Sequence, residues 1–186
     1  MPIIKQIFKN IAKKENPLNQ SDAGNNPELL LIGCVDARKD PVQDLGIPRG
    51  KALILRNIAA LIRGTSVKPE QRETEAAALE FAVKVMKVKH IAVMGHTDCG
   101  GIRAALMGTE FPDIRHYLSP LNDIRREVRD SDKTLEEQAR ILEIEAVKMS
   151  VENLKSYPYI AEAMDKGELE LHGWVLDIST GDLNKV

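Results

Sequence analysis

The sequence is poor in aromatic residues, has only two cysteines and contains no long apolar run. A bilayer-spanning helix needs roughly 18 to 20 consecutive apolar residues, so we expect no membrane partner. In a reducing compartment two spaced cysteines are better interpreted as metal ligands or catalytic groups than as a disulfide. Neither charge sign dominates, with 26 Lys and Arg residues against 28 Asp and Glu residues. No basic stripe is interleaved with aromatics, and we therefore expect no nucleic acid partner.

The length of 186 residues is enough for one well-packed domain and short for two. The first dozen residues are mildly amphipathic, and residues 14–28 are polar and rich in turn formers. They lack the long apolar core and cleavage site of a secretory signal, so we expect a cytoplasmic protein. We predict an N-terminal helix and polar loop, an arm, over residues 1–28, and a zinc-binding α/β catalytic domain over residues 29–186.

Short apolar runs alternate with segments of helical period in the predicted domain. The runs are residues 29–32, 52–55, 90–95 and 169–178, and the helical segments are 70–87, 102–107, 120–129 and 134–154. Continuous apolar runs are typical of strands buried on both faces of a parallel sheet. The pattern predicts a single α/β domain with a central, mainly parallel sheet flanked by helices. Asp132 or Thr134 would cap the last helix.

Both cysteines lie beside groups that suit a metal site. Cys34 closes the first predicted strand, and His96 follows the third. Because carboxyl ends of strands line the ligand crevice of an open α/β sheet, these two side chains should converge there. Cys99 follows His96 at the spacing of a turn that enters a helix. We predict one zinc ion per chain on these three ligands, with a fourth position left for water, as in catalytic zinc sites.

Charged and small residues surround the predicted ligands. Alternate residues of an extended segment share a side, so Asp36 and Arg38 should line one wall with the first cysteine. Arg38 would hold Asp36 through a bidentate contact, and Asp36 would accept a hydrogen bond from the attacking group. Gly100 and Gly101 would let backbone amides approach a small anionic substrate.

Zinc chemistry follows from such a ligand set. The metal lowers the pKa of bound water, and the resulting hydroxide can attack an electrophilic carbon. Two thiolates cancel the formal charge of the ion, whereas three neutral imidazoles would leave it. We therefore expect the water to lose its proton at a higher pH here than on three histidines, and activity to fall as the pH drops.

The motifs resemble those of the β-class carbonic anhydrases, in the same order. They are Cys34-x-Asp36-x-Arg38, Arg56-Asn57, His96-x-x-Cys99-Gly100-Gly101 and His172-Gly173-Trp174, and they run from about Leu29 to Leu183. The resemblance implies a zinc enzyme that reversibly hydrates carbon dioxide to bicarbonate and a proton by attack of zinc-bound hydroxide. It also implies a homodimer or a tetramer of dimers, for which the strand around Trp174 and the N-terminal segment are candidate contact surfaces.

Comparison with that family assigns further positions. Leu53, Ile58 and Phe81 would form the apolar wall for carbon dioxide. Ala37 stands where the family commonly has Ser, and Ala60 where Asn is frequent. Neither departure removes a predicted zinc ligand.

Several alternatives stay open. The same scaffold could hydrolyse carbon disulfide or carbonyl sulfide, or serve as a non-catalytic zinc or bicarbonate sensor. Asp36 could close the site as a fourth ligand, the two cysteines could be core residues, and a disulfide between them could expel the metal. Arg56 has either a structural or a catalytic role. His90, His116 and His172 could export protons, but we assign none of them.

Overall fold

The computed structural model describes residues 24–129 and 131–186, in which strands and helices alternate. The strands are β1 (Leu29–Cys34), β2 (Ala52–Asn57), β3 (His90–His96), β4 (Glu170–Leu176) and β5 (Leu183–Lys185). The α-helices are α2 (Pro41–Asp44), α3 (Glu73–Glu80), α4 (Gly100–Met107), α5 (Pro112–Tyr117), α6 (Asn122–Arg129), α7 (Leu135–Lys155) and α8 (Pro158–Asp165). Shorter helical segments are η2 (Ile58–Ala60), η3 (Pro69–Gln71), η4 (Phe81–Val85) and η5 (Ser119–Leu121).

The predicted N-terminal helix and most of the predicted polar loop lie outside the described residues. The division of the chain at residue 28 therefore stays a prediction. Among the helices of residues 24–129 and 131–186, none has the length and apolar character needed to cross a membrane.

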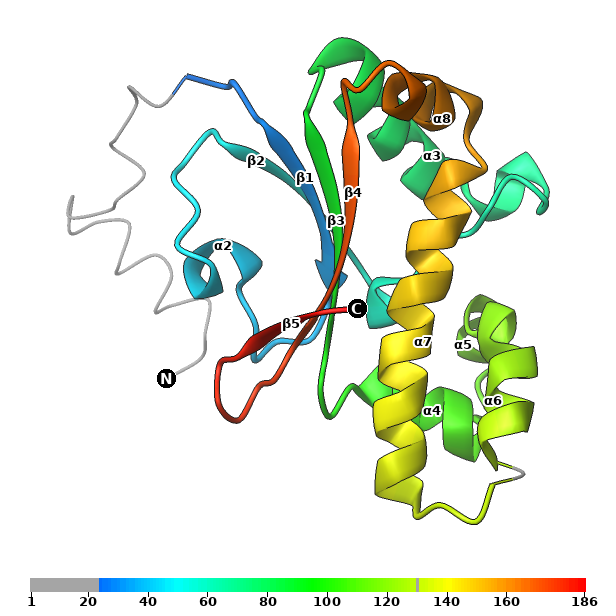
Figure 1. Ribbon diagram of the computed structural model, residues 1–186. Coiled ribbons are helices and arrows are strands. Elements are labelled where there is room, and N and C mark those ends of the chain that lie inside the picture. The colour runs from blue at the N-terminus through cyan, green and yellow to red at the C-terminus, as the bar shows by residue number, and fades with distance from the viewer. Residues whose placement is uncertain (1–23, 130) are drawn as a thin grey trace, which may run out of the picture.

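The five strands form one sheet in the order β2-β1-β3-β4-β5. The first four are parallel to their neighbours, and β5 runs antiparallel to β4. β1 and β3 are buried over nearly their whole length, as their continuous apolar sequences predict. The predicted single α/β domain with a mainly parallel sheet is confirmed, and the carboxyl ends of β1 and β3 lie side by side (Figure 1).

The long helix α7 packs along one face of the sheet, against β3 and β4 (Figure 1). Thr134 is its cap: the Thr134 hydroxyl accepts from the Glu137 amide, and the Glu137 carboxylate accepts from the Thr134 amide at 2.8 Å. The helix lies very close to the strands, because a Cβ on Gly95 would meet Val147 at 2.6 Å. The cap predicted at residue 132 or 134 is thus Thr134.

Two large apolar clusters divide the helical face of the sheet. One joins the sheet to α7 and α8 and includes Ile32, Val93 and Ile160. The other lies among α4, α6 and α7 at the carboxyl ends of the strands, and it includes Cys34 and Cys99. The side chains of both cysteines therefore lie in a buried apolar cluster rather than on an exposed loop.

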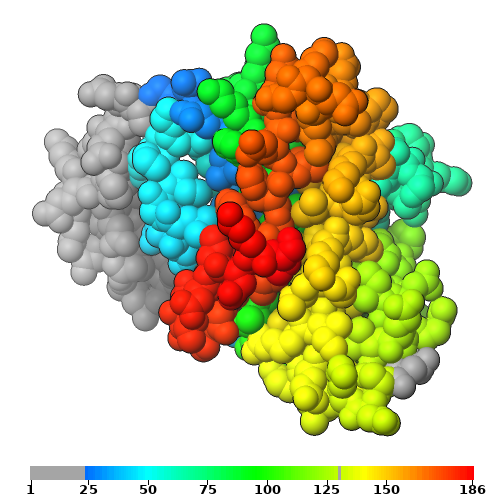
Figure 2. Space-filling model, in the orientation of Figure 1, coloured from blue at the N-terminus to red at the C-terminus, as the bar shows by residue number. Residues whose placement is uncertain are grey.

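Several predicted boundaries are wrong. The predicted strand 169–178 ends at Leu176, because the Asp177 carboxylate accepts the Ser179 amide at 2.8 Å and the chain turns back into β5. β5 was not predicted; it has three exposed residues and lies on the surface beside α7 (Figure 2). β4 is consequently an interior strand at Trp174, so this candidate contact surface is not a free sheet edge there. The edges among the described strands are β2 and β5.

The helix predictions need similar corrections. The predicted helix 70–87 is a 3₁₀ turn, then α3, then the π-helical segment η4. The helices α2, α5 and α8 were not predicted. Each begins with proline at its first turn and has eight residues or fewer, too few to display a clear helical period.

Candidate metal centre

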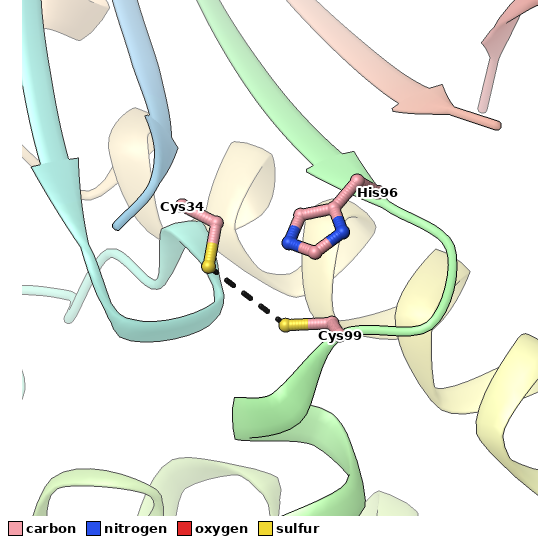
Figure 3. Close-up of side chains that lie close together, drawn as sticks. All are labelled: Cys34, His96 and Cys99. Carbon is pink, nitrogen blue, oxygen red and sulfur yellow. Dashed lines mark hydrogen bonds between the residues drawn. The ribbon is translucent and has the colours of Figure 1, made fainter. Parts of the chain in front are cut away.

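Cys34 and His96 are the last residues of β1 and β3, which are neighbouring parallel strands. Cys99 follows three residues later, at the cap position directly before α4. The three residues are 8%, 3% and 2% exposed. Figure 3 shows their side chains converging from the two strand ends and from the start of α4. The predicted convergence of these three residues is what the structure has.

The donor atoms of this group suit a metal ion. One ligand atom from each residue lies within 4.8 Å of the other two, and the two sulfur atoms are 3.8 Å apart. His96 Nδ1 donates to the Thr97 carbonyl oxygen at 2.9 Å, which leaves the Nε2 lone pair free for a ligand. His96 Nε2 is buried and has no hydrogen-bond partner among the described residues. A buried unpaired nitrogen is costly unless something binds it, so the group is well suited to hold a cation.

The electrostatics of the group follow from a shared proton. The hydrogen bond with Cys99 holds the pKa of the Cys34 thiol far below its usual value. The same bond, together with burial, raises the pKa of Cys99. Burial opposes a charge on His96, but the nearby Cys34 sulfur and the hydrogen bond to the Thr97 carbonyl oxygen outweigh burial and raise the pKa of its ring. The contact between the two sulfurs thus favours a negative charge on Cys34 over one on Cys99.

Asp36 and Arg38 stand beside this group as a bidentate pair. Arg38 Nη2 and Nε donate to the two oxygens of Asp36 at 2.7 and 2.9 Å. The guanidinium holds the pKa of Asp36 well below its usual range. Asp36 Oδ2 lies 3.8 Å from His96 Nε2, so the carboxylate faces the unpaired nitrogen without bonding to it. The predicted pairing is therefore present in the structure.

Asp98 is a site residue whose role was not predicted from the sequence. Its carboxylate accepts from Arg38 Nη1 at 2.8 Å and from Arg103 Nε at 2.9 Å. Its backbone is left-handed, with φ 56°, so the chain turns sharply between His96 and Cys99. It anchors the arginine that holds Asp36. The His-Thr-Asp-Cys sequence places Asp98 beside the ligands, but its ion pairs depend on the loop that carries Arg38.

Two further residues fix the backbone at Cys34 and Cys99. Glu143 of α7 is buried, and its carboxylate accepts from the Cys99 amide at 3.1 Å and from Arg140 at 3.0 Å. Arg56 donates to the carbonyl oxygens of Cys34 at 2.8 Å and Asp36 at 2.7 Å. These contacts support the structural role for Arg56. Glu143 has no local sequence signal, because only tertiary packing brings α7 to Cys99.

The predicted substrate-binding residues do not all lie beside the Cys-His-Cys group. Ile58 packs in the cluster of the two cysteines, and a Cβ on Gly101 would meet its Cγ2 at 2.6 Å, whereas Gly100 has open space around it. Leu53 packs instead in the other large cluster, and Phe81 is 47% exposed. The role of these residues in substrate binding stays a prediction.

The other histidines lie away from the group. His90 begins β3, at the end of the strand opposite to His96, and His172 lies on β4 four residue pairs away from the pair that contains His96. His116 contacts Gln71 at 3.3 Å. The fold and site together define an α/β protein with a buried Cys-His-Cys group, suited to hold a metal ion, at the carboxyl ends of its parallel strands.

Comparison with known proteins names that class. The family described as carbonic anhydrase matches residues 29–183. A mitochondrial β-carbonic anhydrase of Arabidopsis thaliana is 37% identical over 168 residues, which are 86% of this chain and 57% of that protein. A carbonic anhydrase of Candida albicans is 34% identical over 171 residues, 88% of this chain and 57% of the relative. The chain belongs to the β-class carbonic anhydrase family, as the motif resemblance implied, and it spans little more than half the length of these two relatives.

Solved structures support the same assignment. A tetrameric β-carbonic anhydrase of Sordaria macrospora superposes with a TM-score of 0.81 at 29% identity, over 98% of this chain and 92% of the other. A β-carbonic anhydrase of Aspergillus fumigatus superposes with a TM-score of 0.81 at 30% identity, over 98% of this chain and 86% of the other. The fold predicted from strand and helix patterns is therefore that of the family.

Proposed function

We propose that this chain reversibly hydrates carbon dioxide to bicarbonate and a proton, with one zinc ion held by Cys34, His96 and Cys99. The observation that carries the proposal is the fit of these donors to zinc. Zn–S bonds of about 2.3 Å at a tetrahedral angle separate two sulfurs by about 3.8 Å. The two cysteine sulfurs lie at that separation, 3.8 Å. Zinc bound here would act as a Lewis acid and lower the pKa of water in the fourth position.

Asp36 and Arg38 act in this proposal as an orienting pair. An ionised carboxylate is only an acceptor, so Asp36 can hold a water molecule beside the metal group through that water's hydrogen atom. Arg38 keeps Asp36 ionised and in one orientation, and Asp98 in turn holds Arg38 from the other side. This chain of contacts positions the carboxylate before substrate arrives.

The same contacts disfavour Asp36 as a fourth metal ligand. Both of its oxygens already accept hydrogen bonds from Arg38, at 2.7 and 2.9 Å. Moving the carboxylate onto the metal would break at least one of these charge-assisted bonds. We therefore propose that the open form, with a position for water, prevails.

The names of the matched relatives favour hydration over the sulfur substrates or a sensor, because both relatives are carbonic anhydrases. We propose a homo-oligomer, supported by the tetrameric relative from Sordaria macrospora and by the two unpaired sheet edges of the described chain. The cytoplasmic location stays a prediction, since one relative is named as mitochondrial.

The test is stopped-flow carbon dioxide hydration from about pH 6.5 to 9 on protein of known zinc content. Cys99→Ser should lose both zinc and activity. Asp36→Asn should keep zinc and lose at least about 100-fold in hydration rate, because the water molecule beside the metal group is no longer oriented by a carboxylate. Asp123→Asn, at an exposed position of α6, is the matched control and should behave as wild type. A zinc-loaded wild type that is inert at every pH would overturn the proposal.

A further inference from the structure

A second group of metal-binding side chains lies at the opposite end of the sheet. His90 opens β3, and Glu170 and His172 lie at the start of β4. His90 is paired with Glu170 in the parallel ladder, and Ala92 with His172. His96 lies six residue steps along β3 from His90, so at about 3.3 Å per step this group is roughly 20 Å from the Cys-His-Cys group.

The three side chains of this group point their ligand atoms at one another. His90 Nδ1 lies 3.2 Å from His172 Nε2 and 3.6 Å from Glu170 Oε2, and His172 Nε2 lies 3.9 Å from the same oxygen. Metal bonds of about 2.0–2.2 Å at a tetrahedral angle would hold such atoms about 3.3–3.6 Å apart. Only small side-chain movements are needed to bring the three atoms to that spacing.

The scaffold holds this geometry in place. Glu170 and His172 are two residues apart on one strand, so they share a face of the sheet, and the third donor comes from the adjacent strand. The ring of His172 stacks on Trp174 with centroids 5.6 Å apart and planes at 29°. A ladder of backbone hydrogen bonds and a stacked aromatic ring therefore fix two donors, while the exposed Glu170 can adjust.

We propose that His90, Glu170 and His172 form a second binding site, for a divalent transition-metal ion. Two imidazole nitrogens and one carboxylate oxygen select zinc, nickel or copper over magnesium or calcium, which take oxygen ligands. The side chain of Glu170 is 71% exposed and that of His90 is 43% exposed, so water can fill the remaining positions and the ion can exchange. The site is thus an open one that responds to the free metal concentration.

The surroundings determine how tightly this site binds. Metal binding needs neutral imidazoles, and burial together with His90 lowers the pKa of His172. The nearby positive charge of Lys185 has two opposing effects. It also lowers the pKa of His172, which favours the neutral ring, but it repels a bound cation directly. We therefore expect weaker binding here than at the buried thiolate group.

The experiment measures zinc bound per chain across a series of zinc buffers, on the chain of 186 residues. Wild type should bind one zinc tightly and a second at higher free zinc. His90→Gln and Glu170→Gln, both at exposed side chains, should lose only the second step. His116→Gln is the matched control, at an exposed histidine outside both groups, and should keep both steps. Nitrogen NMR of the histidine rings should show His90 Nδ1 and His172 Nε2 shifting during the second step.

The outcomes separate this site from the proposed function. Saturation of wild type at one zinc would overturn the second site, as would a second step that survives in both variants. Loss of the second step in His116→Gln would show adventitious surface binding, and it too would overturn the proposal. The inference does not depend on carbon dioxide hydration, because the variants leave the Cys-His-Cys group intact.

Discussion

Replacing Gly101 by alanine tests the packing that positions Cys99. Gly101 is the second residue of α4, and an added Cβ would lie 2.6 Å from Ile58 Cγ2 and 3.2 Å from Ala59 Cβ. Carbon atoms in favourable contact are about 3.5–4.0 Å apart, so the overlap with Ile58 is about 1 Å. The Cγ2 atom is attached directly to the branched Cβ and cannot turn aside without changing χ1.

Overpacking of this kind costs about 1–3 kcal/mol, and we expect Gly101→Ala to lose about 2 kcal/mol of unfolding free energy. The new methyl should push the start of α4 away from η2 and carry Cys99 with it. Zinc should then leave the protein faster when a chelator is added. Urea denaturation of zinc-loaded protein and chelator competition are the two assays.

Gly100→Ala is the matched control, since its Cβ would meet no atom within 4 Å. Alanine at this helical position should be neutral or stabilising by at most about 1 kcal/mol, because it restricts the unfolded chain. If Gly101→Ala and Gly100→Ala are equally stable, the close contact between α4 and η2 does not exist, and the reasoning fails.

Three further predictions concern the scaffold. Thr134 holds the pKa of Glu137 below its ordinary value near 4.5, so the stabilising effect of Glu137 is complete above that value and is lost as the pH falls through the lower, folded-state pKa. The difference in melting temperature between wild type and Glu137→Gln should therefore be largest near neutral pH and should shrink in acid. A difference that is the same at every pH would contradict this. Tyr157 is buried and donates to a backbone carbonyl at 2.8 Å, so Tyr157→Phe should cost about 1–3 kcal/mol in urea denaturation, more than Tyr159→Phe, whose bond is 3.3 Å long. Lys87 is exposed with φ 54°, so Lys87→Gly should stabilise by about 0.5–1 kcal/mol, and destabilisation in the same assay would rule out the strain.

The fold could be predicted where local pattern and tertiary environment agree. β1 and β3 are continuous apolar runs, and they are buried on both faces, so composition alone indicates central strands. β5 could not be predicted in this way, because its three exposed residues have no apolar period and its place depends on a turn around Asp177. The break between α3 and η4 at Phe81 is likewise absent from the helical period.

The candidate site could be predicted from residue types at strand ends. Cysteine and histidine at the ends of two apolar runs predict convergence because parallel strands end at one edge of a sheet. The sequence cannot show which acid supports which ligand. Asp98 reaches Arg38 across 60 positions, and Glu143 reaches Cys99 across 44, so both contacts depend on how the elements pack.

The sequence by itself determined the class of fold, the convergence of the three residues of the candidate metal centre and the pairing of Asp36 with Arg38. These follow from periodicity and short-range spacing, which act within a few residues of the chain. Only the tertiary structure decided that Glu143 and Asp98 hold the site, and that His90, Glu170 and His172 meet at the other end of the sheet. The register of β3 against β4 places those side chains together, and register is a property of packed strands rather than of either strand alone.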